Sequence, residues 1–159
     1  MKSNDMMKKL FYMLFLLLAM LLTACSSDSA VMLSLPEYQS KELYTEGVWQ
    51  DFTEYGIYTF SPFDKDKLEK NLYFEKVTDL DNILSYILYF EGWLTEDSDL
   101  FEHYSFEKSW IDENDYIFID TDEGKNIGNS THTYGKFDDY NVYFFDIDTY
   151  TLYYFHSNI

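Results

Sequence analysis

The sequence predicts an α+β fold in which one main amphipathic helix packs on an antiparallel β-sheet. Two observations lead to this prediction. Apolar residues between 78 and 94 recur at helical spacing, whereas the C-terminal half contains short runs of β-forming residues separated by polar turns. Because the helix pattern stands apart from the strand patterns, we expect the helix to cover one face of the sheet.

The predicted helix has a recognisable start and end. Thr78 and Asp81 have the spacing of a capping box, and Gly92 is a suitable residue at which to end. One broad apolar face is predicted to consist of Leu80, Ile83, Leu84, Ile87 and Leu88. Such a stripe indicates core packing and not a cofactor site.

Six segments are rich in β-forming residues. They are residues 48–60 with a bulge or break expected at Gly56, 72–77, 104–110, 116–121, 141–147 and 150–156. The last two are predicted to form a hairpin through Asp148 and Thr149. Both alternate positions of this hairpin are apolar, so it is either buried on both faces or presents aromatic side chains to solvent.

The N-terminus has the pattern of a targeting segment. Lys8 and Lys9 precede the apolar run 10–22, which is followed by Leu22-Thr23-Ala24-Cys25. A charged start, a short apolar core and small residues indicate a secretory signal peptide. The run is shorter than the ~20 residues that span a bilayer, so a retained transmembrane helix is disfavoured.

Leu22-Thr23-Ala24-Cys25 resembles the lipobox of bacterial lipoproteins. This resemblance implies that the Cys25 thiol carries a diacylglyceryl group, that the chain is cut before Cys25, and that lipid holds the protein on a membrane. We therefore expect a signal peptide at 1–24, a lipidated tether at 25–42 and a single α+β domain at 43–159. The expected location is extracytoplasmic, with inner and outer membrane both open.

Charge restricts the partners of the chain. Residues 25–159 contain eight lysines, no arginine and 28 aspartates and glutamates, hence a formal charge of −20. Nucleic acids and anionic lipid head groups would be repelled. A basic envelope or secreted protein would be attracted, although such a surface can also serve solubility alone.

Aromatic side chains are unusually abundant, with 30 Phe, Tyr and Trp in residues 25–159. Compositional drift explains part of this excess, but so many rings cannot all fit in one small core. Tyr143, Tyr153 and Tyr154 are the predicted partner-binding residues, because a phenol tolerates water at one end.

One acidic loop has the ligand chemistry of a calcium site. Hard carboxylate and amide oxygens on a flexible loop suit Ca²⁺, although short acidic loops also occur as solvated turns. The candidate ligands are Asp120, Asp122, Glu123 and Asn126. No other cofactor is expected.

No catalytic signature is complete. His103, His132 and His156 form no zinc-binding pair, and Ser105-x-x-Lys108 lacks the further elements of serine penicillin-recognising enzymes. The sequence therefore favours a non-enzymatic, lipid-anchored binding or inhibitory module for a cationic partner. The alternatives are an envelope accessory or assembly lipoprotein and, less favoured, a small hydrolase.

Overall fold

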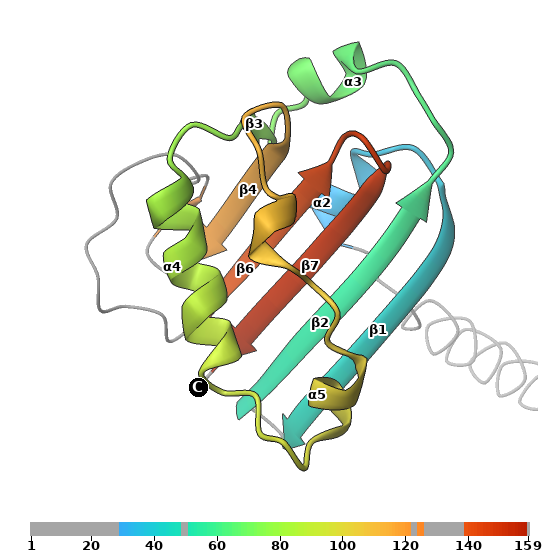
Figure 1. Cartoon of the computed structure of the whole chain (residues 1–159). Helices are drawn as coiled ribbons and strands as arrows, with labels where there is room; N and C mark the ends of the chain where they lie inside the picture. The colour runs from blue at the N-terminus through green and yellow to red at the C-terminus, as the bar shows by residue number, and fades with distance from the viewer. Residues whose placement is uncertain (1–28, 49–50, 122–123, 126–138, 159) are drawn as a thin grey trace, which may run out of the picture. The chain divides into compact units, whose positions relative to one another are not determined.

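An antiparallel sheet runs through the computed structural model (Figure 1). The model describes residues 29–48, 51–121, 124–125 and 139–158, and the chain divides into two units, 1–34 and 35–159. In the first unit, the short helix α2 (Ala30–Leu33) begins after Ser29, whose side chain accepts a hydrogen bond from the Met32 amide at 3.4 Å. The remaining described elements belong to the second unit.

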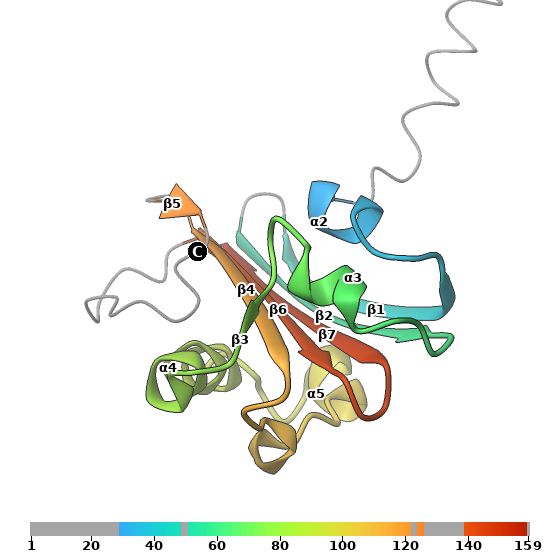
Figure 2. The same cartoon turned by 90° about the horizontal axis from the view of Figure 1, so that it is seen from above.

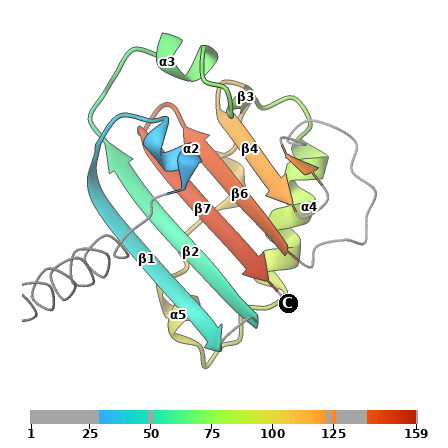
Figure 3. The same ribbon diagram turned by 180° about the vertical axis from the view of Figure 1, so that it is seen from behind.

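The sheet contains seven strands within the described residues, in the order β1-β2-β7-β6-β4-β3, with β5 beside β4 (Figure 3). All pairs are antiparallel. The strands are β1 (Tyr38–Val48), β2 (Asp51–Phe60), β3 (Glu75–Lys76), β4 (Tyr116–Thr121), β5 (Gly124–Lys125), β6 (Asp139–Asp146) and β7 (Thr151–Asn158). The chain is thus of the predicted mixed α+β class.

Two predictions for the N-terminal part of the sheet are wrong. Residues 38–42, expected in the tether, belong to β1. Gly56 forms neither a bulge nor a break: it lies inside β2 in continuous register, opposite Leu43 on one side and Tyr154 on the other. A Cβ at this position would lie 3.0 Å from the Tyr58 ring, so the missing side chain makes room for its neighbours.

The predicted 141–156 hairpin corresponds to β6 and β7, which lie inside the sheet and are buried on both faces. Neighbours on one face include Tyr55, Phe155 and Val142, which follow one another across β2, β7 and β6. On the opposite face Tyr143 pairs with Tyr154. This double burial explains why both alternate positions are apolar.

Helix α4 (Leu80–Glu91) and helix α5 (Asp99–His103) lie on the same side of the sheet (Figure 2). The cap of α4 is Asp79, whose carboxylate accepts the Asn82 amide at 3.0 Å, so the capping box at Thr78 and Asp81 was predicted wrongly. Residues 105–107 and the 3₁₀ turn η1 (Lys108–Trp110) follow α5. A last short helix, α3 (Asp66–Glu69), precedes β3.

The buried face of α4 differs from the predicted one. Its fully buried apolar side chains are Ile83, Tyr86, Ile87 and Phe90. Leu80 and Leu88 are 43% and 54% exposed, contrary to the prediction. The buried residues follow one stripe at spacings of three and four, and two of them are aromatic, which the leucine pattern alone did not reveal.

The segment 104–110 is not a strand, contrary to the prediction. Phe106 is 5% exposed and packs against the rings of Tyr153 and Phe155 on the sheet, at centroid distances of 5.0 and 5.1 Å. Lys108 Nζ lies 2.6 Å from Glu91 Oε2 of α4, and the Tyr104 hydroxyl donates to Glu91 Oε1 at 2.9 Å. These contacts lay the segment across the sheet face instead of along an edge.

Candidate functional site: an acidic cavity with aromatic walls

A cavity of about 240 Å³ lies where η1 and the loop after it meet the β6–β7 connection. Its lining combines carboxylates with two aromatic rings. The lining residues are Trp110, Asp112, Asp115, Asp146, Asp148, Thr149 and Tyr153. All of them lie among the described residues of the second unit.

Asp115 connects the two segments that form the cavity. Its side chain is buried, and it accepts the Asp112 amide at 2.9 Å and the Ile147 amide at 3.0 Å. The pKa of this carboxyl is raised to about 6, chiefly by burial and to a smaller extent by the nearby charges of Asp112 and Asp146, while the two amide hydrogen bonds oppose the shift. The cavity therefore contains a buried carboxylate whose negative charge is only partly offset by its neighbours.

Asp146 shapes the β6–β7 connection. Its Oδ1 accepts the amides of Asp148 and Thr149 at 2.9 and 3.1 Å, and its Oδ2 accepts the Thr149 hydroxyl at 2.8 Å. Tyr150 then adopts a positive φ of 53° and the chain enters β7. This network holds Asp146 and Asp148 at the cavity beside Asp115.

No lysine or histidine of the described residues forms an ion pair with any of the four cavity aspartates. Lys108, the basic residue nearest to them in the sequence, instead pairs with Glu91. Unpaired carboxylates around a partly enclosed space produce a negative potential that is stronger than on an open surface. The cavity therefore favours a positively charged occupant.

The aromatic walls come from Trp110 and Tyr153, whose ring centroids lie 5.5 Å apart with an interplanar angle of 39°. Trp110 is 38% exposed, whereas Tyr153 is only 8% exposed. Burial raises the pKa of the Tyr153 phenol to about 12, with smaller contributions from Tyr55 and Asp146.

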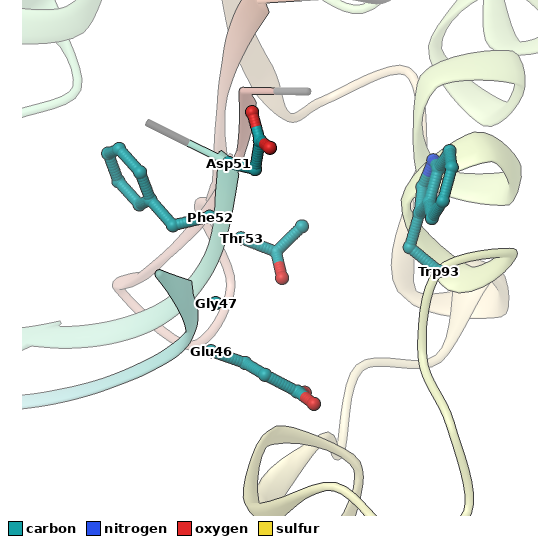
Figure 4. Close-up of a pocket in the computed structure, with 6 residues that line it drawn as sticks. All are labelled: Glu46, Gly47, Asp51, Phe52, Thr53 and Trp93. Carbon is teal, nitrogen blue, oxygen red and sulfur yellow. The ribbon is translucent and has the colours of Figure 1, made fainter. Parts of the chain in front are cut away.

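A second cavity, of about 200 Å³, lies at the end of the β1–β2 hairpin. Trp93, 48% exposed, stands across the opening from Asp51 and Thr53, with Glu46 below (Figure 4). Gly47 has a φ of 116°, and a Cβ there would collide with the Asp51 carbonyl at 2.3 Å. This cavity has one aromatic wall, Trp93, and two carboxylates, whereas the first cavity has two aromatic walls and four carboxylates. It is therefore the weaker candidate for a binding site.

The three tyrosines predicted to bind a partner do not lie together. Tyr153 lines the acidic cavity on the helix-covered face. Tyr143 and Tyr154 belong to the opposite face, where their rings pack at 5.0 Å and the Tyr154 hydroxyl donates to Asn141 Oδ1 at 2.9 Å. Tyr143 is 5% exposed and Tyr154 is half-buried, so neither is prominent at the surface.

The predicted calcium ligands are only partly described. Asp120 lies in β4 opposite Lys125, whereas Asp122, Glu123 and Asn126 lie outside the described residues. No group of three His, Cys, Asp or Glu side chains in the described ranges is arranged to hold a metal ion. The calcium site stays a prediction.

The histidines play different roles. His103 stacks on Tyr44 at 4.2 Å, and His156 Nδ1 lies 3.0 Å from the Tyr140 carbonyl oxygen. They sit on opposite faces of the sheet, because Tyr44 lies on the face of Tyr55 and His156 on that of Tyr154. His132 and Cys25 lie outside the described residues.

Comparison with protein-family models, with curated proteins and with solved structures finds no match to this chain. Among the described residues, no helix has the length and apolar character needed to cross a bilayer. The interpretation of the cavity therefore rests on its own chemistry.

Proposed function

We propose that this protein is a lipid-anchored, extracytoplasmic binding or inhibitory module, without enzymatic activity, that recognises a cationic protein. The observation that supports this most directly is the cavity in which four aspartates without a cationic partner among the described residues surround an opening beside the exposed Trp110. The charge of −20 on residues 25–159 would steer a basic partner toward it.

The proposed anchor is a diacylglyceryl group on Cys25. Each buried methylene contributes about 0.8 kcal/mol, and two acyl chains are enough for stable membrane attachment. The resemblance of residues 22–25 to a lipobox and the charged, apolar leader before it support this part of the proposal.

Replacement of Cys25 by serine is expected to abolish lipidation and to leave the precursor uncleaved by the lipoprotein peptidase, because the hydroxyl does not replace the acylated thiol. Metabolic labelling with palmitate, followed by immunoprecipitation, measures this directly. The wild-type chain should take up the label and the variant should not. Labelling of the Ser variant would contradict the proposed anchor.

We further propose that α4 is the one main amphipathic helix and the principal cover of the sheet. Its support is the stripe of Ile83, Tyr86, Ile87 and Phe90, all fully buried. The position of α4 bears on the cavity, because Glu91 at the end of α4 contacts Lys108 and Tyr104 of the segment that leads to Trp110.

A pull-down from envelope extract tests the partner. The full chain, immobilised in detergent, is expected to retain a basic protein at low salt and to release it at high salt, since electrostatic steering is screened. The double variant Asp112→Asn/Asp148→Asn removes two exposed cavity charges and should lower retention. The double variant Glu96→Gln/Asp97→Asn removes two exposed charges that do not line the cavity and serves as the control.

Three outcomes are informative. Retention that both double variants reduce equally would indicate that net charge, and not the cavity, attracts the partner. Retention of a non-basic protein, insensitive to salt, would favour the alternative function as an envelope accessory or assembly lipoprotein. If no protein is retained at low salt, the binding function is contradicted.

A further inference from the structure

We propose that the outer edge of β1 binds an extended segment of the cationic partner as one more strand of the sheet. The segment would carry basic side chains opposite Glu42 and Glu46 and an apolar side chain opposite Tyr44. This inference rests on the proposed function, because it names the surface and the conformation through which a cationic partner is held.

Strand β1 forms one margin of the sheet, and no strand of the described residues pairs with its outer side (Figure 3). Residues 40–48 pair with β2 one by one, after a single irregularity between Tyr38 and Ser40. In a regular antiparallel pair, every second residue of the outer strand directs its amide and carbonyl away from its neighbour. These groups are available to a further strand, and β1 contains no proline that would remove one of them.

The opposite margin of the sheet offers no comparable edge. Strand β3 has only two residues, and the outer side of β4 is shared between β3 and β5. Short edge strands are a usual protection against unwanted pairing. Strand β1, in contrast, is eleven residues long, and most of its described side chains are exposed.

The charges along β1 favour a basic strand. Glu42, Tyr44 and Glu46 lie on the same face, because alternate residues of a strand share a face. Glu42 accepts the Tyr44 hydroxyl at 2.7 Å, and within the described residues neither glutamate forms an ion pair. Basic side chains opposite the two glutamates would form cross-strand pairs of opposite charge, which stabilise a sheet.

Helix α5 lies against the same face of β1. His103 stacks on the Tyr44 ring at 4.2 Å, and its Nε2 lies 3.8 Å from Asp99 Oδ1. The pKa of Tyr44 is raised above its usual value, chiefly by the hydrogen bond to Glu42, then by desolvation and by the charges of Glu42 and Asp99. Carboxylates from β1 and from α5 thus act on the same stretch of the edge.

A second copy of this chain is a poor occupant of the edge. When a strand pairs antiparallel with its own copy about a two-fold axis, the central residue faces itself. Lys41 or Glu42 at the centre would face its own charge, and Tyr44 at the centre would place Glu42 opposite Glu46. With either remaining residue of 41–45 at the centre, one glutamate would lie diagonal to its own copy, within reach of a long side chain. The charges therefore disfavour self-pairing.

An antiparallel register sets the spacing that the segment needs. The residues opposite Glu46, Tyr44 and Glu42 are two positions apart, so the pattern is basic-x-apolar-x-basic. The intervening residues face Thr45 and Leu43 on the other side of the sheet, where Leu43 is 40% exposed. A threonine opposite Thr45 and a valine opposite Leu43 suit these positions.

The test uses the full chain in detergent and the fluorescent peptide Ser-Thr-Lys-Thr-Val-Val-Lys-Thr-Ser-amide, whose affinity is measured by anisotropy. Two isomers carry three N-methyl groups at alternate residues, one from the first lysine onward and the other from the residue after it. Only one set of amides can face β1, so one isomer should bind like the parent and the other at least about tenfold more weakly. Equal affinities of the isomers, or no binding of the parent at low salt, would overturn the inference.

Variants test the charge pairing. Glu42→Gln/Glu46→Gln is expected to weaken binding of the parent peptide about fivefold, as loss of two exposed ion pairs does. Glu107→Gln/Glu113→Gln removes the same charge from exposed residues outside β1 and is the control, with a change below about twofold. Equal weakening in both double variants would show that net charge, and not the edge, attracts the peptide.

Amide hydrogen exchange locates the bound peptide. Binding is expected to slow exchange in residues 40–48 and to leave exchange in β6 unchanged. Binding without protection of 40–48 would contradict strand addition. Protection of 40–48 that appears with rising protein concentration, without peptide, would assign the edge to a second copy and overturn the inference as well.

Failure of this inference is separable from failure of the proposed function. A basic protein that wild type and Glu42→Gln/Glu46→Gln retain equally, with no protection of residues 40–48, would disprove the added strand and leave the binding module intact. The absence of any basic partner would contradict the proposed function itself.

Discussion

Replacement of Ile87 by alanine is expected to lower the free energy of unfolding by about 2–5 kcal/mol, the range for large-to-small changes in a core. Ile87 is fully buried and belongs to the same hydrophobic cluster as Phe90 of α4 and Val142 and Phe144 of β6. The variant loses the transfer free energy of the deleted atoms and leaves a cavity that the packed rings cannot fill. Urea titration, followed by far-UV circular dichroism, measures the change.

Leu88→Ala is the matched control for this prediction. Leu88 is the next residue on the same helix and is 54% exposed, so its truncation should change the free energy of unfolding by no more than about 0.5 kcal/mol. Equal losses in the two variants would contradict the placement of α4 on the sheet. A loss below half a kcal/mol in Ile87→Ala would show that this face of the helix is not buried.

The second large effect concerns pH and Asp115. Its pKa rises from 3.8 to about 6 on folding, chiefly through burial. Between these values Asp115 holds a proton in the folded protein that it has released in the unfolded chain, so its protonation contributes stability as the pH falls from 7 to 4. This contribution is complete below the unfolded pKa and is lost as the pH rises through about 6.

The variant Asp115→Asn stays neutral throughout and lacks this dependence. We expect the free energy of unfolding of the wild type, relative to the variant, to increase by about 2 kcal/mol between pH 7 and pH 4. The other carboxylates are present in both proteins and cancel in the difference. Urea titrations at several pH values give the result, with Asp97→Asn as an exposed control. A difference that is flat with pH, or that increases above pH 6, would contradict the buried state of Asp115.

The pattern of apolar and polar residues along the chain correctly predicted the strands whose residue types suit their place in the sheet. The β-forming runs at 116–121 and 141–156 correspond to β4 and to the β6–β7 hairpin, because strands at the centre of a sheet need apolar side chains on both faces. The segment 104–110 has the same β-forming composition but lies across the sheet. Its position depends on contacts with Glu91, Tyr153 and Phe155, which local pattern does not contain.

The cavity could not be predicted either, because it is formed by residues that lie far apart in the sequence. Asp115 and Ile147 are 32 positions apart in the sequence, and their hydrogen bond brings two ordinary acidic turns together. In a chain with 29 acidic residues, no pattern marks these four aspartates. Tyr153, one of the predicted partner-binding residues, lines the cavity. Trp110 lies in a segment predicted to be a strand, and no local pattern predicts its place at the cavity, because that place depends on how η1 crosses the sheet.

The position of β7 has a consequence for the order in which the molecule folds. Strand β7 lies between β2 and β6, so that Phe52 pairs with Asn158 and Thr59 with Thr151. Until synthesis has passed β7, the β1–β2 hairpin presents an open strand edge to other chains. Such distant pairing slows folding and prolongs the exposure of that edge. Chains that are cut before Thr151 would therefore lose the centre of the sheet, not its margin, and become substrates for proteolysis and aggregation.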